Sequence, residues 1–204
     1  MIKGITFDLW DTVFIDDSDE TKRAKAGRPS KAIERRQLIH SFVSKQTNLS
    51  LEIISQSYDN ADKEFKEVWH NEHITWPVHH RLSRILNKLN VNLSEQDMNE
   101  LVRAHEEMEL EFRPDFIPGI HDAITKLSKV YQLGVISDAI FSPGRVLRQL
   151  LKDEGILNYF EIFAFSDEVG HSKPHKSMFQ HAWNGLNLLP KEIVHIGDRE
   201  HNDI

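Results

Sequence analysis

The chain has 204 residues, of which 39% are hydrophobic and 28% charged, and its formal net charge is −7. Such a chain can bury a substantial core, as one large domain or as a core with a smaller second domain. The negative charge argues against general binding to nucleic acids or anionic membranes. The absence of cysteine excludes disulfides and zinc–thiolate sites and fits a cytoplasmic protein. No apolar run approaches the roughly 20 residues of a membrane span, and the N-terminus leaves no room for a signal peptide.

The first predicted element is a strand in residues 2–7, a short run rich in β-branched and aromatic side chains. Asp8 follows it directly, and Asp11 comes three residues later. In open α/β sheets, ligands bind beyond the carboxyl ends of the strands. A carboxylate there is costly to bury unless a cation or a donor compensates it. Asp8 is therefore a candidate site residue, and the alternative is a helix or turn cap.

Residues 15–32 are almost all polar and contain the breakers Gly27 and Pro29, which predicts an exposed connector. Basic residues of this region and of the next helix could guide an anionic substrate, or could belong to a solvated linker and helix face. These basic residues are Lys22, Arg23, Lys25, Arg28, Lys31, Arg35 and Arg36.

Helical periodicity extends from Ser30 to Phe112 and predicts four helices. They begin near Ser30, Ser50, Trp76-Pro77 and Ser94, and the serines are suitable N-caps. The connections between these helices are short, which favours antiparallel neighbours and a small helical bundle.

Breakers between residues 113 and 119 mark a boundary, after which strands and helices alternate. The predicted elements are a helix over 119–129, a strand over 132–137, a helix from Pro143, a strand over 161–165, a helix from about 175 and a strand over 192–196. This alternation indicates a parallel sheet with right-handed crossovers. The simplest organisation is a discontinuous α/β core, 1–14 and 114–204, with a helical insertion over 15–113.

Two of these later strands also end in small polar or acidic residues. The strand at 132–137 delivers Ser137 and Asp138, and the last strand is followed by Asp198 and Asp203. Lys173 precedes a proline between them. Each piece alone could be a turn, a helix cap or a surface lysine, but together with the acid after the first strand they form an ordered set.

These four pieces, in this order, resemble the haloacid dehalogenase (HAD) superfamily of hydrolases. The position of the helical insertion resembles the subgroup of phosphoglycolate phosphatase-like and 2-haloacid dehalogenase-like enzymes. The resemblance implies an α/β fold, a Rossmann-like parallel sheet core with an inserted α-helical cap domain. Resembling proteins usually continue with another helix and strand after the last acidic motif, so a chain ending at Ile204 is expected to leave one sheet edge under-protected.

The resemblance also implies a nucleophile and a metal site. Asp8 would attack phosphorus and form an aspartyl-phosphate, which divides one difficult displacement into two easier ones. Mg²⁺ would lie between this carboxylate and the phosphate, because it prefers oxygen ligands. Asp8, Asp198 and the main-chain carbonyl of Trp10 would be its ligands, and Asp203 would order the groups around it.

The remaining motif residues would hold the phosphate. Ser137 and the amide of Asp138 would bind the transferring oxygens, and Lys173 would neutralise their charge, since phosphoryl transfer needs mainly positioning and charge stabilisation. The expected activity is Mg²⁺-dependent hydrolysis of a small phosphorylated metabolite. The sequence identifies neither that metabolite nor the oligomeric state.

Trp10 departs from the family pattern, in which a second aspartate two residues after the nucleophile is the general acid. Asp11, one residue later, is a candidate acid, but a shift of one residue in an extended segment turns a side chain to the opposite face. Loss of a general acid typically costs ~10²–10⁴-fold in rate. An aromatic residue here also resembles 2-haloacid dehalogenases, which use the same aspartate without a metal. A third alternative is a catalytically weak phosphate-binding or regulatory protein.

Overall fold

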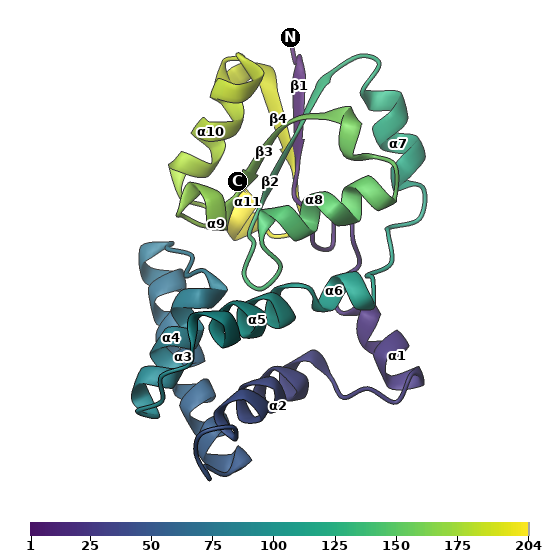
Figure 1. Ribbon diagram of the computed structural model, residues 1–204. Coiled ribbons are helices and arrows are strands. Elements are labelled where there is room, and N and C mark those ends of the chain that lie inside the picture. Colours follow the sequence, from purple (N-terminus) through teal and green to yellow (C-terminus); the bar gives the residue numbers. More distant parts are fainter. Residues whose placement is uncertain (204) are drawn as a thin grey trace.

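The computed structural model describes residues 1–203, and the expectation about the chain after Ile204 lies outside these residues. Its centre is a four-stranded parallel sheet with the order β3-β2-β1-β4 (Figure 1). The strands are β1 (Gly4–Phe7), β2 (Gln132–Ser137), β3 (Phe160–Phe165) and β4 (Ile193–Ile196). The predicted α/β fold with a parallel sheet is confirmed.

The burial of each strand follows its place in the sheet. All of β1 is buried, because it pairs with β2 on one side and β4 on the other. In the edge strand β4, half-buried residues alternate with exposed ones. Strands that are covered on both faces consist of continuous apolar runs. The strand closest to the N-terminus thus lies between two strands from the C-terminal half of the chain.

Helices cover both faces of the sheet. On one face, Leu133 and Val135 belong to the core cluster that includes Ile124 of α7 (Ile120–Leu127) and Leu147 of α8 (Gly144–Asp153). On the other face, Ile136 packs with Met178 of α10 (Lys176–Leu186). The remaining elements of this half are α9 (Ser166–Val169), α10 (Lys176–Leu186), α11 (Glu200–Asp203) and the 3₁₀ turns Leu157–Tyr159 and Pro190–Glu192.

A helical segment with its own hydrophobic core lies beyond the carboxyl ends of the strands (Figure 1). Its main helices are α2 (Lys31–Val43), α3 (Leu51–Glu72), α4 (Val78–Lys88) and α5 (Glu95–Glu106). The serine N-caps of α2, α3 and α5 are present, and the Ser94 hydroxyl accepts the Asp97 amide at 3.0 Å. We call this segment the cap; its expected limits, 15–113, stay a prediction.

The prediction for residues 15–32 was wrong in part. They contain the helix α1 (Ser18–Lys25), and Asp19, Arg23 and Lys31 are buried. Ion pairs compensate these buried charges: Arg23 pairs with Glu34, and Lys31 pairs with Asp19. A second short helix, α6 (Met108–Glu111), lies where the chain returns from the cap.

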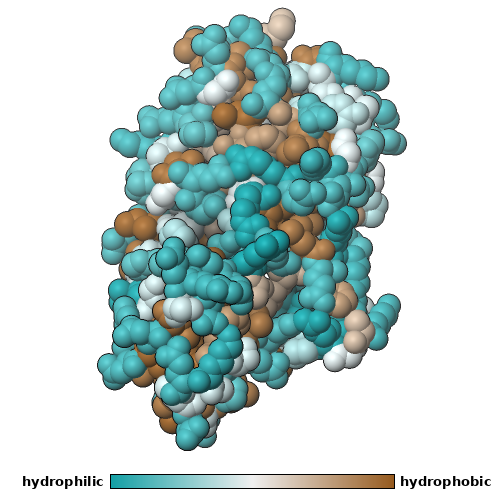
Figure 2. All heavy atoms as spheres, in the orientation of Figure 1, coloured by the Kyte–Doolittle hydropathy of each residue, from teal (hydrophilic) through white to brown (hydrophobic). Residues whose placement is uncertain are grey.

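The outer surface shows no single dominant patch in the view of Figure 2, where hydrophilic residues cover most of the face and hydrophobic ones form small separate groups. Among residues 1–203, none of the helices has both the length and the apolar character that a bilayer span requires.

Candidate active site

The candidate site begins with Asp8, which is buried at the end of β1. The Asp8 amide donates to the carbonyl of Ile196 at 2.8 Å, which joins it to the end of β4. The Leu9 amide donates to Oδ1 of Asp8 at 2.7 Å. The two hydrogen bonds fix both the backbone and one carboxylate oxygen of Asp8.

A cluster of carboxylates forms where β1 and β4 end. Asp8, Asp198 and Asp203 each offer one oxygen, and these oxygens lie within 4.8 Å of one another. The Arg199 amide donates to Oδ2 of Asp203 at 2.9 Å, which turns the short α11 toward the cluster. A Cβ on Gly197 would lie 2.2 Å from this oxygen, so any other residue there would displace the Asp203 side chain. The residues from opposite ends of the chain therefore meet as the sequence predicted.

Lys173 is buried beside this cluster. Its Nζ lies 2.8 Å from Oδ2 of Asp8 and 2.6 Å from Oδ1 of Asp203. Burial disfavours the charge of Lys173, but the carboxylates of Asp8 and Asp203 raise its pKa above the ordinary lysine value. Desolvation opposes the charge of Asp203 as well, yet hydrogen bonds from His195 and Lys173 hold its pKa well below its usual range. Both side chains are therefore ionised at neutral pH.

The donor set fits a hard divalent cation. Asp8 is buried, whereas Asp198 is exposed and lies 3.5 Å from Nε of Arg199. The three carboxylates thus face two cations, Lys173 and Arg199, and one negative charge stays unbalanced. All the clustered ligand atoms are oxygens, which is the set that Mg²⁺ prefers. Trp10 is half-buried and lines the adjoining cavity.

The end of β2 supplies the next two predicted residues. Ser137 is fully buried, and among the described residues its Oγ has no hydrogen-bond partner. The Asp138 carboxylate accepts the backbone amide of Lys173 at 2.9 Å. Burial raises the pKa of Asp138 to about 6, although Lys173 opposes the shift. Asp138 is among the described residues that line the cavity, and Ser137 directly precedes it at the end of β2.

A cavity of about 280 Å³ separates these residues from the cap. The residues that line it from the core side include Asp8, Trp10, Asp138, Phe141, Lys173, Arg199 and Asn202. Those that line it from the cap and its connections are Asp16, Asp17, Lys31, Arg35, Trp69 and Glu109. In the sequence, Lys31 and Arg35 stand out only as part of a basic cluster, and no motif marks the other four. Their approach to the site depends on how the cap lies over the sheet, which no local pattern encodes.

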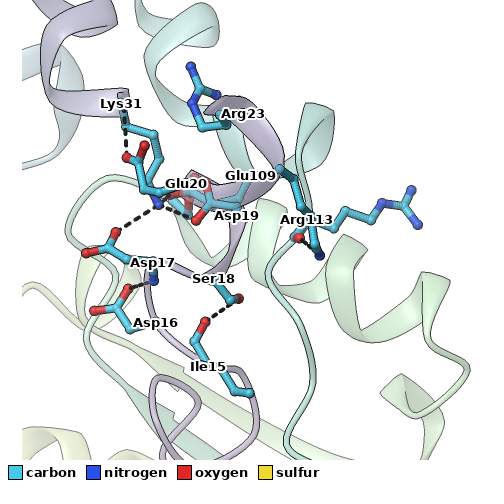
Figure 3. Close-up of polar contacts among 12 residues, drawn as sticks. Ile15, Asp16, Asp17, Ser18, Asp19, Glu20, Arg23, Lys31, Glu109 and Arg113 are labelled. Carbon is cyan, nitrogen blue, oxygen red and sulfur yellow. Dashed lines mark hydrogen bonds and ion pairs between the residues drawn. The ribbon is translucent and has the colours of Figure 1, made fainter. Parts of the chain in front are cut away.

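Lys31 is not a free cation in this cavity. Its Nζ lies 2.8 Å from Asp19, 3.2 Å from Glu109 and 3.3 Å from Asp17, as Figure 3 shows for part of this network. Burial disfavours its charge, but Glu109 and Asp19 raise the pKa of Lys31 above the ordinary value. The ion pairs join α1 to α2 and to α6, and so connect both chain crossings of the cap.

The candidate acid of the sequence, Asp11, stays a prediction, and the structure brings a second carboxyl group, that of Asp16, to the cavity. Asp11 is exposed, its carboxylate accepts the Asp16 amide at 3.0 Å, and it is not among the described residues that line the cavity. Asp16 is also exposed, but it lines the cavity, so it lies at the cavity mouth. Desolvation there, together with the neighbouring carboxylate of Asp17, raises the pKa of Asp16 above its usual value. Trp10 packs edge-on against Phe14, with ring centroids 5.4 Å apart.

Comparison with known proteins identifies the class. Residues 48–204 match the family model described as haloacid dehalogenase-like hydrolase, so the chain belongs to that family. The resemblance noted in the sequence is thereby confirmed. A glyceraldehyde 3-phosphate phosphatase from Pyrococcus abyssi is 27% identical over 205 residues, which cover 100% of this chain and 76% of the relative. A phosphoglycolate phosphatase from Nitrosococcus oceani is 29% identical over 87 residues, which cover 42% of this chain and 37% of the relative.

Solved structures agree on the fold. A 2-haloacid dehalogenase from Pseudomonas syringae pv. Tomato has a TM-score of 0.64 at 19% identity, over 100% of this chain and 81% of the other. A HAD phosphatase from Thermococcus onnurineus has a TM-score of 0.61 at 18% identity, over 100% of this chain and 80% of the other. These similarities define the fold alone, because both chemistries occur among the neighbours.

Proposed function

We propose that the protein is a Mg²⁺-dependent phosphohydrolase that acts on a small phosphorylated metabolite through an aspartyl-phosphate. The observation that carries this proposal is the cluster of Asp8, Asp198 and Asp203 within 4.8 Å, beside the buried Lys173. Phosphatases among the relatives that match the whole chain support it. A preserved acid cluster has a clear use when a cation binds, since repelling carboxylates otherwise destabilise the site.

In this proposal Asp8 is the nucleophile. Oδ1 of Asp8 is held by the Leu9 amide, and Oδ2 is the oxygen that contacts Lys173. One carboxylate oxygen forms a bond to phosphorus as the bond from phosphorus to the leaving oxygen breaks, and water later hydrolyses the acyl phosphate. When bound by Asp8, Asp198 and the Trp10 carbonyl, with Asp203 ordering them, Mg²⁺ supplies the positive charge that lets an anionic carboxylate approach an anionic ester.

The chain's own cation and donors act on the transferring group. Lys173 neutralises charge on its oxygens, and Ser137 with the Asp138 amide donates hydrogen bonds to them. Lys173 is suited to this because Asp8 and Asp203 keep it protonated. The cap excludes bulk water from the cavity, which strengthens these interactions.

The test is the variant Asp8→Asn. It should abolish turnover of 4-nitrophenyl phosphate in the presence of Mg²⁺ and leave the far-ultraviolet circular dichroism spectrum unchanged, because the amide keeps the shape but is a poor nucleophile. The wild type with EDTA should be equally inactive. Retention of Mg²⁺-dependent activity in the variant would contradict the proposal.

A 2-haloacid dehalogenase activity is the second candidate, because Trp10 occupies the place of the usual acid and lines the cavity. The same Asp8 would then displace halide from carbon and would need no metal. Release of chloride from 2-chloropropionate in the presence of EDTA would favour this activity over the phosphatase.

A further inference from the structure

The cavity has two ends with different chemistry. Asp8 and Lys173 lie at the end formed by the sheet, and Arg35 of α2 and Trp69 of α3 line the cap side. A substrate whose phosphate meets Asp8 therefore presents its remaining atoms to the cap. With a volume of about 280 Å³, the cavity suits a small molecule.

Two hydrogen-bond donors on the cap side are buried without a partner among the described residues. One is Nε of Arg35, whose guanidinium lies over the Phe141 ring with its Cζ 3.5 Å from the centroid. The other is the indole Nε1 of Trp69. Neither group can accept a hydrogen bond, and leaving a buried donor unpaired is costly. A ligand oxygen that accepts from these donors removes that cost.

The charges around these donors decide what kind of oxygen fits. Three carboxylates, of Asp17, Asp19 and Glu109, form ion pairs with two cations, Lys31 and Arg35 (Figure 3 shows those around Lys31). The group thus has a formal charge of −1. Glu109 lies 3.2 Å from Lys31 and 3.9 Å from Arg35, and it also accepts the Ser142 hydroxyl. The cations near a second anionic group of the substrate would already be paired with carboxylates. The one carboxylate in excess would repel that group.

We infer that the part of the substrate remote from the phosphate is uncharged and carries carbonyl or hydroxyl oxygens, which Arg35 and Trp69 hold by hydrogen bonds. Hydroxyl groups in the same place can donate hydrogen bonds to Asp17 and Glu109. The cap side can therefore bind both hydrogen-bond acceptors and hydrogen-bond donors of the substrate. The inference rests on the proposed phosphatase activity and narrows its substrate to phosphorylated aldehydes, ketones and polyols. It disfavours phosphorylated carboxylic acids and inorganic pyrophosphate.

The matched pair that tests the charge argument is glyceraldehyde 3-phosphate and 3-phosphoglycerate, which differ in an aldehyde against a carboxylate. The measured quantity is the ratio of their kcat/KM values, which does not depend on the fraction of folded enzyme. We expect the wild type to favour the aldehyde. Glu109→Gln should shrink this preference about tenfold or more, because removal of one buried charge changes the local potential strongly. Glu111→Gln, in the same short helix but paired with the exposed Arg28, should leave it unchanged.

Trp69→Phe tests the donor, since it keeps an aromatic ring and removes the N–H. It should lower kcat/KM for glyceraldehyde 3-phosphate several-fold relative to propyl phosphate, which has no oxygen beyond the phosphate. Trp76→Phe is the control, because Trp76 packs against Phe65 as Trp69 does but does not line this cavity.

The two proposals can fail separately. If 3-phosphoglycerate is preferred, if Glu109→Gln leaves the ratio unchanged, or if only 4-nitrophenyl phosphate is hydrolysed, the inference about the substrate is wrong and the phosphatase activity stands. If no phosphate is released from any of the four esters with Mg²⁺, the proposed function fails, and the inference falls with it.

Discussion

At the scale of single residues, the proton donor is the point at which the site differs most from its family pattern. Trp10 occupies the usual position of the acid and cannot donate to a leaving alkoxide as a carboxylic acid does. The next residue, Asp11, has a φ of 53° and is exposed, with its carboxylate engaged by the Asp16 amide. Asp16 instead lies at the cavity mouth with a raised pKa, so it keeps its proton to higher pH than an ordinary aspartate.

The variant Asp16→Asn should therefore reduce turnover selectively. We expect kcat for an alkyl phosphate, whose leaving group needs a proton, to fall by ~10²–10⁴-fold. Turnover of 4-nitrophenyl phosphate should fall much less, because its leaving group is a weak base. Asp11→Asn is the matched control and should change neither rate. If Asp11→Asn alone produced the selective loss, Asp11 and not Asp16 would be the proton donor.

At the scale of elements, most helices and strands formed where local sequence signals predicted them. The serine caps of α2, α3 and α5 accept backbone amides, and their hydrogen bonds depend only on neighbours three residues away. Helix α1 was missed because its sequence lacks an apolar stripe. It is held instead by buried ion pairs, including that of Arg23 with Glu34, whose partners lie outside the helix.

Helix α5 contains a buried titratable group, His105. Its Nδ1 donates to the carbonyl of Leu101 at 2.8 Å, and its Nε2 has no partner among the described residues. Burial lowers the pKa of His105 to about 4, and the nearby charges of Arg35 and Arg81 act in the same direction. The folded protein thus holds this histidine neutral at pH values where the unfolded chain would protonate it.

Stability should consequently depend on pH through His105. Its folded pKa lies below the unfolded value of 6.5, so its contribution is complete above pH 6.5 and is lost as the pH falls through 4. Over that window the free energy of unfolding should decrease by up to about 3 kcal/mol. Urea unfolding of the wild type and of His105→Gln between pH 4 and 7.5 measures this, and the variant should show a smaller decrease. The exposed His79→Gln should behave as the wild type; an identical pH slope in His105→Gln would refute the assignment.

At the scale of the whole molecule, the site exists because the first strand is inserted between strands from the other half of the chain. Its neighbours are β2 and β4, so Asp8 meets residues that are more than 120 positions away in the sequence (Figure 1). The carboxylates of the resulting cluster repel one another, and Lys173 and Arg199 neutralise this charge only in part. A bound cation should therefore stabilise the whole fold.

Thermal unfolding can measure this coupling. At a Mg²⁺ concentration of about 100 times its dissociation constant, binding to the folded state alone adds about 2.7 kcal/mol, which raises Tm by roughly 5–10 °C for a chain of this size. Asp198→Asn should remove most of the shift, and Asp59→Asn, a surface acid that pairs with Arg36, should retain it. An undiminished shift in Asp198→Asn would place the cation elsewhere.

The sequence alone determined the order of strands and helices, the acids at the strand ends and the glycine beside them, because these depend on local periodicity and turn chemistry. Only the tertiary structure decided that Lys173 contacts both Asp8 and Asp203, that Asp11 faces away, and that Arg35, Trp69 and Glu109 line the cavity. The physical reason is that the contacts of Lys173 depend on the order of the strands in the sheet, and the cavity lining depends on how the cap lies over that sheet. That placement results from packing and buried ion pairs between segments far apart in the chain, and no single segment carries a signal for it.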